Sequence, residues 1–343
     1  MARALVAMSG GVDSSVAAAL MLDEGHEVVG VTMKLWGGPS DSGCCSVADV
    51  EDARRVAQQL GIDHWVFNFT DRFDADVVAP YVAAHAAGRT PNPCVECNRH
   101  LKFDRLLRRA EQLGFDVVVT GHHARTSVDP ETGRWRLMRG VDGAKDQSYV
   151  VAVLDQAALA RVRFPVGELT KAEVRAIAAA RGLRTAAKPD SQDVCFISAT
   201  GGRRAFLEPR IALHPGRVVD TAGVEVGSVD AVELVTVGQR RGLHTGGGPA
   251  RYAIDVDTTT ATVTVGSIDD LRSGCVTLTG MTWVDEPVTG SVLVQCSAHG
   301  RPIAATIDDD LVVTFDQRQR RVASGQAVVL YDGDTVLGGG TAQ

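Results

Sequence analysis

The chain has 343 residues, of which 45% are hydrophobic and 22% charged, and its formal net charge is −7. This length predicts two or three domains, and no run approaches the roughly 18 apolar residues that a membrane span needs. The start lacks a basic segment leading into an apolar one, so we expect no signal peptide and a cytoplasmic protein. Seven cysteines, an odd number, argue against an extracellular disulfide framework and favour chemistry or metal binding.

The first predicted element is a strand over 4–8, followed by the loop Ser9-Gly10-Gly11-Val12-Asp13-Ser14-Ser15 and an alanine-rich helix. Glycines let the backbone approach a ligand closely, and the N–H groups at a helix start favour anions. The loop therefore predicts a site for a phosphate chain, with a generic Gly-Ser turn as the alternative. It lacks the lysine of a Walker loop and the glycine pattern of a Rossmann fold. It resembles instead the SGG-x-DS loop of the N-type ATP pyrophosphatases.

Strand-like and helix-like segments alternate up to about residue 200. Strands are expected over 27–33, 64–69 and 116–120, and helices over 47–60, 71–87, 99–113 and 169–181. The last helix begins with Thr170 and Glu173 in capping-box spacing. This alternation predicts an α/β fold with a doubly wound parallel sheet, in which ligands bind beyond the carboxyl ends of the strands. The loops after Met8, Met33 and Thr120 should therefore meet at one crevice.

Short alternating segments separated by turn residues replace the helical pattern beyond about residue 205. They are expected over 217–220, 232–237, 252–256, 260–265, 276–283, 292–297, 303–307, 311–315 and 327–331. This pattern predicts all-β domains that include a C-terminal β-barrel. We therefore expect a catalytic domain at 1–204, a central β-rich domain at 205–270 and a barrel at 271–343.

Two further segments present cysteines. Residues 90–98 contain Cys94 and Cys97, and their prolines and asparagines predict irregular backbone just before a basic helix. Helix N-termini and nearby cations favour the reactive thiolate. Residues 190–197 form a polar loop that presents Cys195. A single C-x-x-C is ambiguous between zinc, redox and structural roles, but two cysteine loops beside a nucleotide motif are less ambiguous.

Most of the basic residues are arginines, and many of them are clustered. The clusters lie at 99–109, 134–139, 203–204, 240–241 and 318–321. Arginine gives planar, bidentate contacts to phosphate. Solvated helix faces and surface ion pairs are the simpler explanation for any single cluster.

With these motifs, the chain resembles the tRNA-specific 2-thiouridylases of the bacterial MnmA family over nearly its full length. The matching segments are 7–14, 31–34, 88–93, 120–123, 145–149, 164–169, 193–197, 237–243 and 337–340. The resemblance implies an adenine nucleotide alpha hydrolase-like fold of the N-type ATP pyrophosphatases. It also implies a reaction that replaces the C2 oxygen of the wobble uridine, position 34 of tRNA, by sulfur. In that reaction the uracil O2 attacks the α-phosphate of ATP and pyrophosphate leaves, which makes C2 electrophilic.

The resemblance also assigns roles to residues. ATP, together with Mg²⁺, would be held by Ala7, Met8, Ser9, Gly10, Gly11, Val12, Asp13, Ser14, Met33 and Gly121. The tRNA would be contacted by Asn92, Pro93, Cys94, His122, Lys145, Asp146, Gln147 and Gln326. Cys195 would carry a persulfide, and Cys97 would be the partner nucleophile that closes a disulfide as sulfur is delivered. The implied partners are the tRNA anticodon loop, with its wobble base flipped into the crevice, and a persulfide donor such as a cysteine desulfurase or relay protein. The central domain at 205–270 would also bind tRNA. No membrane is implied.

Cys94 departs from the family pattern, because many relatives carry an aspartate there as the proposed proton-transfer group. Glu96 is one candidate substitute. Alternatively, Cys94, Cys97 and Cys195 hold a 4Fe–4S cluster with an open site that binds sulfide. We favour the persulfide route, which needs no extra cofactor, and no metal site is firmly predicted. Asp13 suits assistance to Mg²⁺ and capping of the following helix equally well.

Two other functions compete with tRNA thiolation. An amidotransferase-type ATP pyrophosphatase acting on a small metabolite would need no reactive cysteine pair and no basic RNA surface. A zinc-stabilised RNA-binding module would hold metal at Cys94 and Cys97 and would not need the loop at 9–15.

The remaining cysteines and one histidine receive structural assignments. Cys44 and Cys45 are expected to be incidental, and Cys275 and Cys296 to be small buried residues in strands. His123 is expected to be structural.

Overall fold

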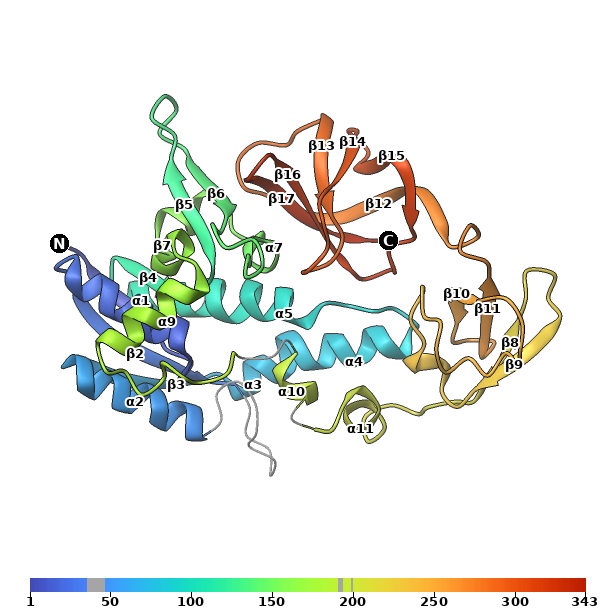
Figure 1. The fold of residues 1–343 in the computed structure, drawn as a ribbon, viewed down its shortest axis with the longest axis horizontal. Helices are drawn as coiled ribbons and strands as arrows, with labels where there is room; N and C mark the ends of the chain where they lie inside the picture. Colours follow the sequence, from blue (N-terminus) through green and yellow to red (C-terminus); the bar gives the residue numbers. More distant parts are fainter. Residues whose placement is uncertain (36–46, 191–193, 199) are drawn as a thin grey trace.

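The computed structural model describes residues 1–35, 47–190, 194–198 and 200–343. Its first part is a five-stranded parallel sheet in the order β3-β2-β1-β4-β7 (Figure 1). The strands are β1 (Arg3–Ala7), β2 (Glu27–Lys34), β3 (Asp63–Asn68), β4 (Val117–Thr120) and β7 (Val162–Arg163). Strand β1 lies at the centre, and its apolar residues are buried on both faces, as is usual for parallel strands.

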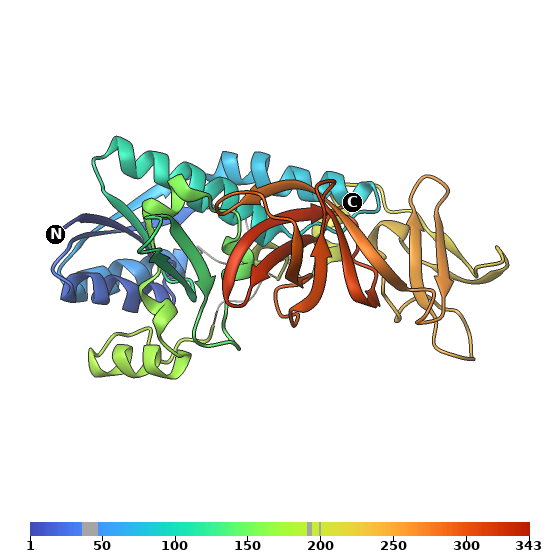
Figure 2. The same cartoon turned by 90° about the horizontal axis from the view of Figure 1, so that it is seen from above.

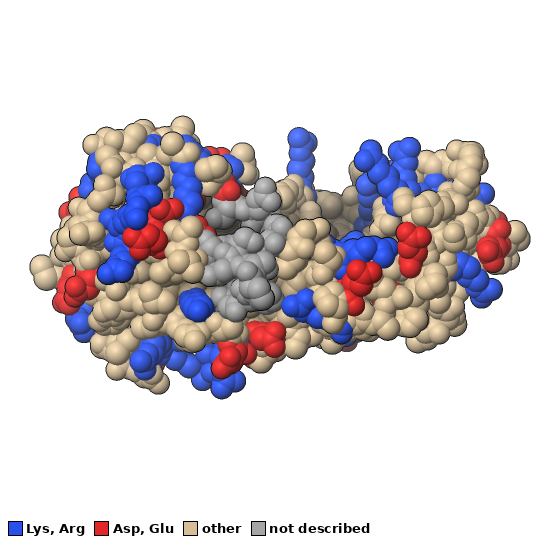
Figure 3. Space-filling model, turned by 90° about the horizontal axis from the view of Figure 1, so that it is seen from below, with Lys and Arg blue, Asp and Glu red and all other residues tan. Residues whose placement is uncertain are grey.

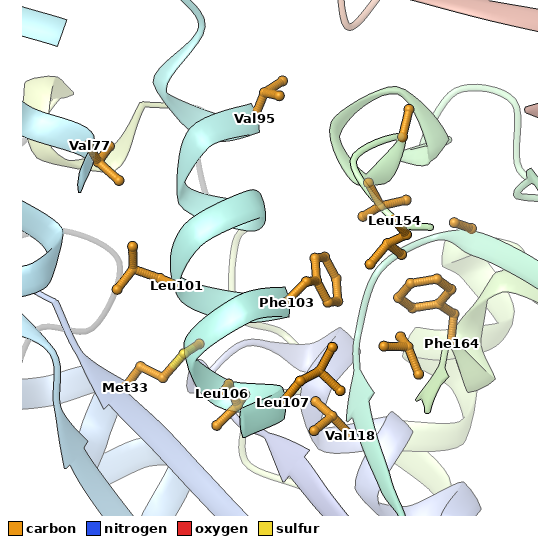
Figure 4. Close-up of a cluster of buried hydrophobic side chains, with 14 of the residues drawn as sticks. Met33, Val77, Val95, Leu101, Phe103, Leu106, Leu107, Val118, Leu154 and Phe164 are labelled. Atoms are coloured by element: carbon orange, nitrogen blue, oxygen red, sulfur yellow. The ribbon is translucent and has the colours of Figure 1, made fainter. Parts of the chain in front are cut away.

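Helices cover both faces of this sheet, so the predicted doubly wound α/β class is confirmed. One face packs against α1 (Val12–Asp23), α2 (Val47–Leu60) and α9 (Lys171–Ala180). The other face packs against α6 (Leu106–Gln112) through apolar side chains that include Leu106 and Val118 (Figure 4). Helix α9 begins with the predicted capping box, in which Thr170 and Glu173 bond to each other's backbone N–H groups.

Two long helices contain π-helical segments. The first consists of α3 (Thr70–Phe73), η1 (Asp74–Val78) and α4 (Ala79–Ala86), and the second of α5 (Pro93–Glu96), η2 (Cys97–Arg105) and α6. The irregular backbone expected over 90–98 is therefore wrong beyond Asn92. Proline is tolerated at the first helical position, and the Asn92 side chain caps the helix by accepting a hydrogen bond from the Cys94 N–H at 3.1 Å.

The other described helices are short and connect these elements. They are α7 (Ser148–Val151), α8 (Gln156–Ala160), η3 (Pro165–Glu168), α10 (Cys195–Ser198), α11 (Arg203–Leu207) and η4 (Val232–Leu234). Within the parts of the chain that the structure describes, no helix is both long and apolar enough to cross a membrane.

A four-stranded sheet, in the order β10-β11-β8-β9, follows the domain of the parallel sheet, which we call the nucleotide domain after its predicted phosphate-chain site. Its strands are β8 (Gly216–Val219), β9 (Glu225–Val229), β10 (Tyr252–Asp257) and β11 (Thr262–Gly266). The strand predicted over 232–237 is wrong, because this stretch begins with the 3₁₀-helix η4. Val232 and Val235, three residues apart, both point into the core of this sheet, and this spacing suits a helical turn.

The last part of the chain is a closed six-stranded barrel, which confirms the predicted C-terminal β-barrel. Its strands are β12 (Arg272–Trp283), β13 (Gly290–Gln295), β14 (Ile303–Ile307), β15 (Val312–Arg320), β16 (Ala327–Asp332) and β17 (Thr335–Ala342). Figures 1 and 2 show the barrel between the parallel sheet and the four-stranded sheet along the long axis of the molecule. The strand pattern did not predict β17, because its glycine run is typical of a turn. A Cβ atom on Gly338 would lie only 2.7 Å from the Thr282 carbonyl oxygen, so the close approach of β12 requires this glycine.

A hairpin of the nucleotide domain joins the barrel sheet, which the sequence did not predict. It consists of β5 (Ala124–Val128) and β6 (Trp135–Arg139). Strand β6 pairs antiparallel with β17, and Leu137 lies opposite Val336. The hairpin therefore places residues that follow β4 against the barrel.

Candidate active site

The loop between β1 and α1 presents the start of the helix. Gly11 is the N-cap and no side chain caps the helix. The Ser14 and Ser15 hydroxyls donate to the Gly11 carbonyl at 3.2 and 2.8 Å, which holds the loop against the helix. Gly10 has a φ of 73°, and a Cβ on it would lie 2.3 Å from the Asp49 carbonyl oxygen. Only glycine fits this close contact with α2.

A cavity of 510 Å³ lies beyond the carboxyl ends of β1, β2 and β4. It is lined by Met8, Met33 and Thr120, so the three loops meet at one crevice, as the sequence predicted. Of the residues predicted to bind ATP, those that line it are Ala7, Met8, Ser9, Gly11, Val12, Asp13, Ser14, Met33 and Gly121. Gly10 does not line it, because it faces α2.

Three cysteines line the same cavity. Cys94 and Cys97 lie in the first turns of the long helix, and Cys195 begins the short helix α10. The two cysteine segments touch, because the Val194 N–H donates to the Cys94 Sγ at 3.4 Å. Phe196 anchors α10 by packing edge-on against Phe73 at 5.5 Å between ring centroids. The structure therefore brings all three predicted thiols to the nucleotide loop.

Glu96 is not brought to the cavity. It lies 3.2 Å from His100 and 3.7 Å from Arg99, its neighbours on the helix surface. Residues three apart share a helix face, so Cys94 and Cys97 point the same way whereas Glu96 points elsewhere. Glu96 therefore stays outside the set of cavity-lining residues.

The residues predicted to contact tRNA fall into two groups. Pro93, Cys94, His122, Lys145, Asp146 and Gln147 line the cavity. Asn92 and Gln326 are not among the lining residues. Asn92 caps the helix, and the Gln326 amide donates to the Thr90 carbonyl and so joins the barrel to the segment before the cysteines.

His122 forms a rigid part of the cavity wall. It is 7% exposed, and its Nδ1 lies 2.7 Å from the Thr120 hydroxyl. Burial, reinforced by the Lys102 and His123 charges, holds the pKa of His122 well below its usual value. The ring is therefore neutral, and its Nε2 lies 3.4 Å from the Lys102 ammonium.

A charged network that the sequence did not identify lies beside the loop at 9–15, which we call the phosphate-type loop because it is predicted to bind a phosphate chain. The Lys171 ammonium contacts the carboxylates of Asp13 at 2.7 Å and Asp190 at 2.9 Å. His123 Nε2 lies 3.2 Å from Asp13, and Lys145 Nζ lies 2.8 Å from Asp190. Burial opposes the ionisation of Asp13, but hydrogen bonds from His123 and Lys171 outweigh it, so the Asp13 pKa lies below its usual value. The Asp13 side chain therefore contacts Lys171 and His123 and does not cap α1.

The signal for Lys171 was present but indirect. It is one of few lysines in the chain, and it directly follows the capping residue Thr170. Strand order alone could not show that the start of α9 lies beside α1. His123, expected to be structural, holds Asp13 at the cavity and so has a place in the site.

Several predicted basic clusters are engaged in packing. Arg99 donates to the Thr282 hydroxyl of the barrel at 2.8 Å, and Arg203 donates to the Leu234 carbonyl at 2.7 Å. Arg136 pairs with Asp129. Figure 3 shows Lys and Arg side chains in separate groups on the lower face, several beside acidic side chains.

Cys275 and Cys296, the other cysteines that the structure describes, are not among the lining residues. Cys275 is exposed, so the expectation of a buried residue there is wrong, because its side chain lies on the outer face of β12. Cys296 is half-buried, and burial raises its pKa to about 11. Cys44 and Cys45 lie outside the described residues. Among the described residues, no group of three or more His, Cys, Asp or Glu side chains is arranged to hold a metal ion.

Comparisons with known proteins cover the whole chain. Family models match residues 2–199 (tRNA methyl transferase HUP domain), 204–267 (tRNA methyl transferase PRC-barrel domain) and 273–342 (Aminomethyltransferase beta-barrel domain). The tRNA-specific 2-thiouridylase MnmA of Frankia casuarinae is 48% identical to this chain, and the match covers 98% of this chain and 98% of the relative. That of Chloroflexus aurantiacus is 46% identical, and the match covers 99% of this chain and 98% of the relative.

This chain belongs to the tRNA-specific 2-thiouridylase family. The 2-thiouridylase resemblance drawn from the motifs is therefore confirmed, and so is the enzyme class at the level of the family. Among solved structures, a 4-thiouridine synthetase in complex with RNA and bound ATP is similar to part of this chain. It has a TM-score of 0.39 and 20% identity, and the match covers 59% of this chain and 46% of that chain.

Proposed function

We propose that this chain uses ATP to replace the C2 oxygen of the wobble uridine, position 34 of tRNA, by sulfur taken from a cysteine persulfide. One observation carries the proposal: residues of the phosphate-type loop and the thiols Cys94, Cys97 and Cys195 line the same cavity. An amidotransferase-type enzyme has no need of these thiols, and a zinc module has no need of the loop. The names of the curated relatives support thiolation as the chemistry.

The first step forms an adenylate. The uracil O2 attacks the α-phosphorus of ATP, the bond to the β-phosphate oxygen breaks, and pyrophosphate leaves while the N3 proton is released. The N–H groups at the start of α1 and the Lys171 ammonium are suited to the negative charge of the leaving pyrophosphate. Mg²⁺ would accompany the nucleotide, and Asp13 and Asp190 are the nearby carboxylates. Without adenylation, the oxygen of the amide-like C2–O bond is a poor leaving group.

The second step transfers sulfur. The terminal sulfur of a persulfide on Cys195 attacks C2, and AMP leaves as the C2–O bond breaks. The Cys97 thiolate then attacks the Cys195 sulfur and forms a disulfide, while the electron pair of the broken S–S bond stays on the sulfur attached to C2. N3 takes up a proton and the thione results. A thiol reductant restores the two cysteines, and a donor such as a cysteine desulfurase or relay protein reloads Cys195.

We favour this route over the cluster alternative because reactive thiols need no extra cofactor. Cys94 accepts a hydrogen bond from the Val194 N–H, which ties it to the segment that presents Cys195. Cys94 is therefore suited to holding the two thiol segments together.

Reaching C2 of a stacked anticodon base requires that the base be flipped out. A cavity of 510 Å³ is large enough to receive a pyrimidine beside a nucleotide triphosphate chain. Pro93, Lys145 and Gln147 line it and are placed to contact the base or its phosphates. We assign these contacts to the anticodon loop, and we expect binding to weaken with salt.

Mass spectrometry of tRNA after reaction tests the proposal. Wild-type protein with ATP, a persulfide donor and unmodified tRNA should add sulfur to uridine 34, and Cys97→Ser and Cys195→Ser should not. Cys275→Ser, an exposed cysteine away from the cavity, is the matched control. Pyrophosphate release that needs no tRNA would favour a small-metabolite enzyme, and sulfur gain in both site variants would remove the thiol roles.

A further inference from the structure

One arginine connects two walls of the cavity. Arg139 ends strand β6, and its side chain is 16% exposed. Its Nη1 donates to Asp146 Oδ2 at 2.8 Å, and its Nη2 donates to Gln295 Oε1 at 2.9 Å. Asp146 belongs to the cavity-lining segment 144–147, whereas Gln295 ends strand β13 of the barrel. A single planar group therefore bridges the nucleotide domain and the barrel at the site.

Gln295 extends this contact to the barrel loop at 297–300. Its side chain is almost fully buried, and its Nε2 donates to the carbonyl oxygens of Ser297 at 2.9 Å and Ala298 at 3.1 Å. Ala298 and His299 line the cavity. Because both the oxygen and the nitrogen of this amide are engaged, its orientation is set, and the position of Arg139 determines where the loop begins.

Asp146 extends the contact in the other direction. Its Oδ1 accepts the N–H groups of Gly140 and Ser148, both at 3.0 Å, and Oδ2 also accepts the Ser148 hydroxyl at 2.9 Å. The neighbouring Gln147 donates its N–H to the His123 carbonyl at 2.8 Å. His123 in turn contacts Asp13 of the phosphate-type loop. The contacts thus run from the barrel to the nucleotide loop.

The aromatic ring of Tyr331 provides a third anchor. The Arg139 guanidinium lies 3.7 Å from the centroid of this fully buried ring on β16, and the Tyr331 hydroxyl lies 3.1 Å from the Ser148 hydroxyl. Cation–π contacts strengthen when they are removed from water. Lysine has no planar fork, so it cannot stack on the ring and bond to Asp146 and Gln295 at once.

We propose that Arg139 is a positioning residue that holds the barrel loop 297–300 against the segment 145–147 and so completes the tRNA side of the cavity. The inference rests on the proposed function, because a completed wall matters most for a large substrate that contacts both domains. Arg139 is not among the lining residues and acts through Asp146 and Gln295. The phosphate-type loop and Lys171 are held by contacts within the nucleotide domain, so ATP affinity should depend little on Arg139.

The test compares Arg139→Lys, Gln295→Leu and the double variant. Each single variant should lower kcat for thiolation by about tenfold to a hundredfold, as expected for misplaced reacting groups. The double variant should lose no more than the worse single variant, because both break one connection. The dissociation constant for ATP without tRNA should stay within about twofold, a margin small against the tenfold expected for a lost contact. Arg136→Lys, on the same strand with an ion-pair partner away from the cavity, is the control and should match wild type.

Hydrogen exchange gives a readout that does not depend on activity. In Arg139→Lys, the amides of Gln147 and Gly300 should exchange faster together, while those of β1 remain protected. If the variant shows faster exchange at both segments but wild-type protein does not thiolate tRNA, the connection through Arg139 is supported and the proposed function is rejected. A kcat for Arg139→Lys equal to that of wild type, additive losses in the double variant, or unchanged exchange at either segment would overturn the positioning role.

Discussion

The Lys171 ammonium lies 2.7 Å from a carboxylate oxygen of Asp13, although 158 positions separate the two residues in the sequence. The phosphate-type loop contains no lysine of its own. The start of α9 therefore supplies the cation that the loop lacks. Asp13 and Asp190 hold the ammonium at the cavity wall, where it is 12% exposed.

Replacing Lys171 by methionine should lower tRNA-dependent pyrophosphate release by about a hundredfold or more, because charge on the leaving pyrophosphate loses its cationic partner. The variant also leaves Asp13 and Asp190 close together without the cation between them. Lys188→Met is the matched control, because Lys188 pairs with Asp49 and Asp52 and is not a lining residue. Release by Lys171→Met at the rate of the control would contradict the assignment.

Adding one methyl group at Gly121 should impair nucleotide binding. A Cβ there would lie 2.5 Å from the Ser14 N atom, so the start of α1 would have to shift. Overpacking of this kind costs about 1–3 kcal/mol. Gly143→Ala is the control, because no atom lies within 4 Å of its added Cβ. Calorimetric titration with ATP should show weaker binding in Gly121→Ala only. Equal affinities in the two variants would show that the contact between position 121 and the start of α1 leaves room for a methyl group.

The stability of the fold should decrease in mild acid because of His85. This residue is 2% exposed on α4, and burial, reinforced by the Arg203 charge, lowers its pKa to about 4. Below about pH 6.5 the unfolded state binds a proton that the folded state does not, so the free energy of unfolding falls as pH drops toward about 4. At about pH 5 the loss from this group is about 2 kcal/mol.

Denaturant unfolding of wild type and His85→Leu at about pH 7 and about pH 5 measures this effect, because the two proteins share all other titrating groups. The pH-dependent loss should be smaller in the variant by about 2 kcal/mol. The same loss in both proteins would mean that His85 is protonated in the folded state.

Restoring the family carboxylate tests the role of Cys94. Cys94→Asp should retain thiolation with a persulfide donor in protein free of iron, because neither sulfur-transfer step uses the Cys94 thiol. The same measurement on Cys94→Ser separates proton transfer from packing, because serine supplies neither a carboxylate nor a soft sulfur acceptor for Val194. Loss of turnover in both variants, with recovery of wild type only after anaerobic iron and sulfide reconstitution, would favour the cluster.

Local sequence patterns predicted the parallel sheet and the loop at 9–15 because each depends on residues close together in the chain. Apolar runs such as 4–8 need a partner on both faces, and the Thr170–Glu173 spacing forms a capping box within one turn. The helix start at Pro93 was missed because proline was taken as a breaker, although the first helical position has no intrahelical N–H bond to lose. Missing this helix start does not affect the predicted site, because Cys94 and Cys97 both line the cavity.

What the sequence could not show depends on contacts between distant segments. Lys171 reaches Asp13 only because α9 packs beside α1. Arg139 was grouped with Arg134 and Arg136 in a basic cluster, for which solvated faces and surface ion pairs were the simpler explanation, but pairing of β6 with β17 turns it inward. The glycines of β17 have no apolar side chains to give a strand pattern, and only the approach of β12 explains them.

The pairing of β6 with β17 has a consequence for how the protein is made. Strand β17 leaves the ribosome long after the nucleotide domain. The β5–β6 hairpin therefore lacks its pairing strand until the end of the chain has been synthesised. Domains that emerge first can fold first, but this one acquires its last cavity wall only when the barrel closes. The barrel residues that line the cavity, Ala298 and His299, are therefore added only with the late part of the chain.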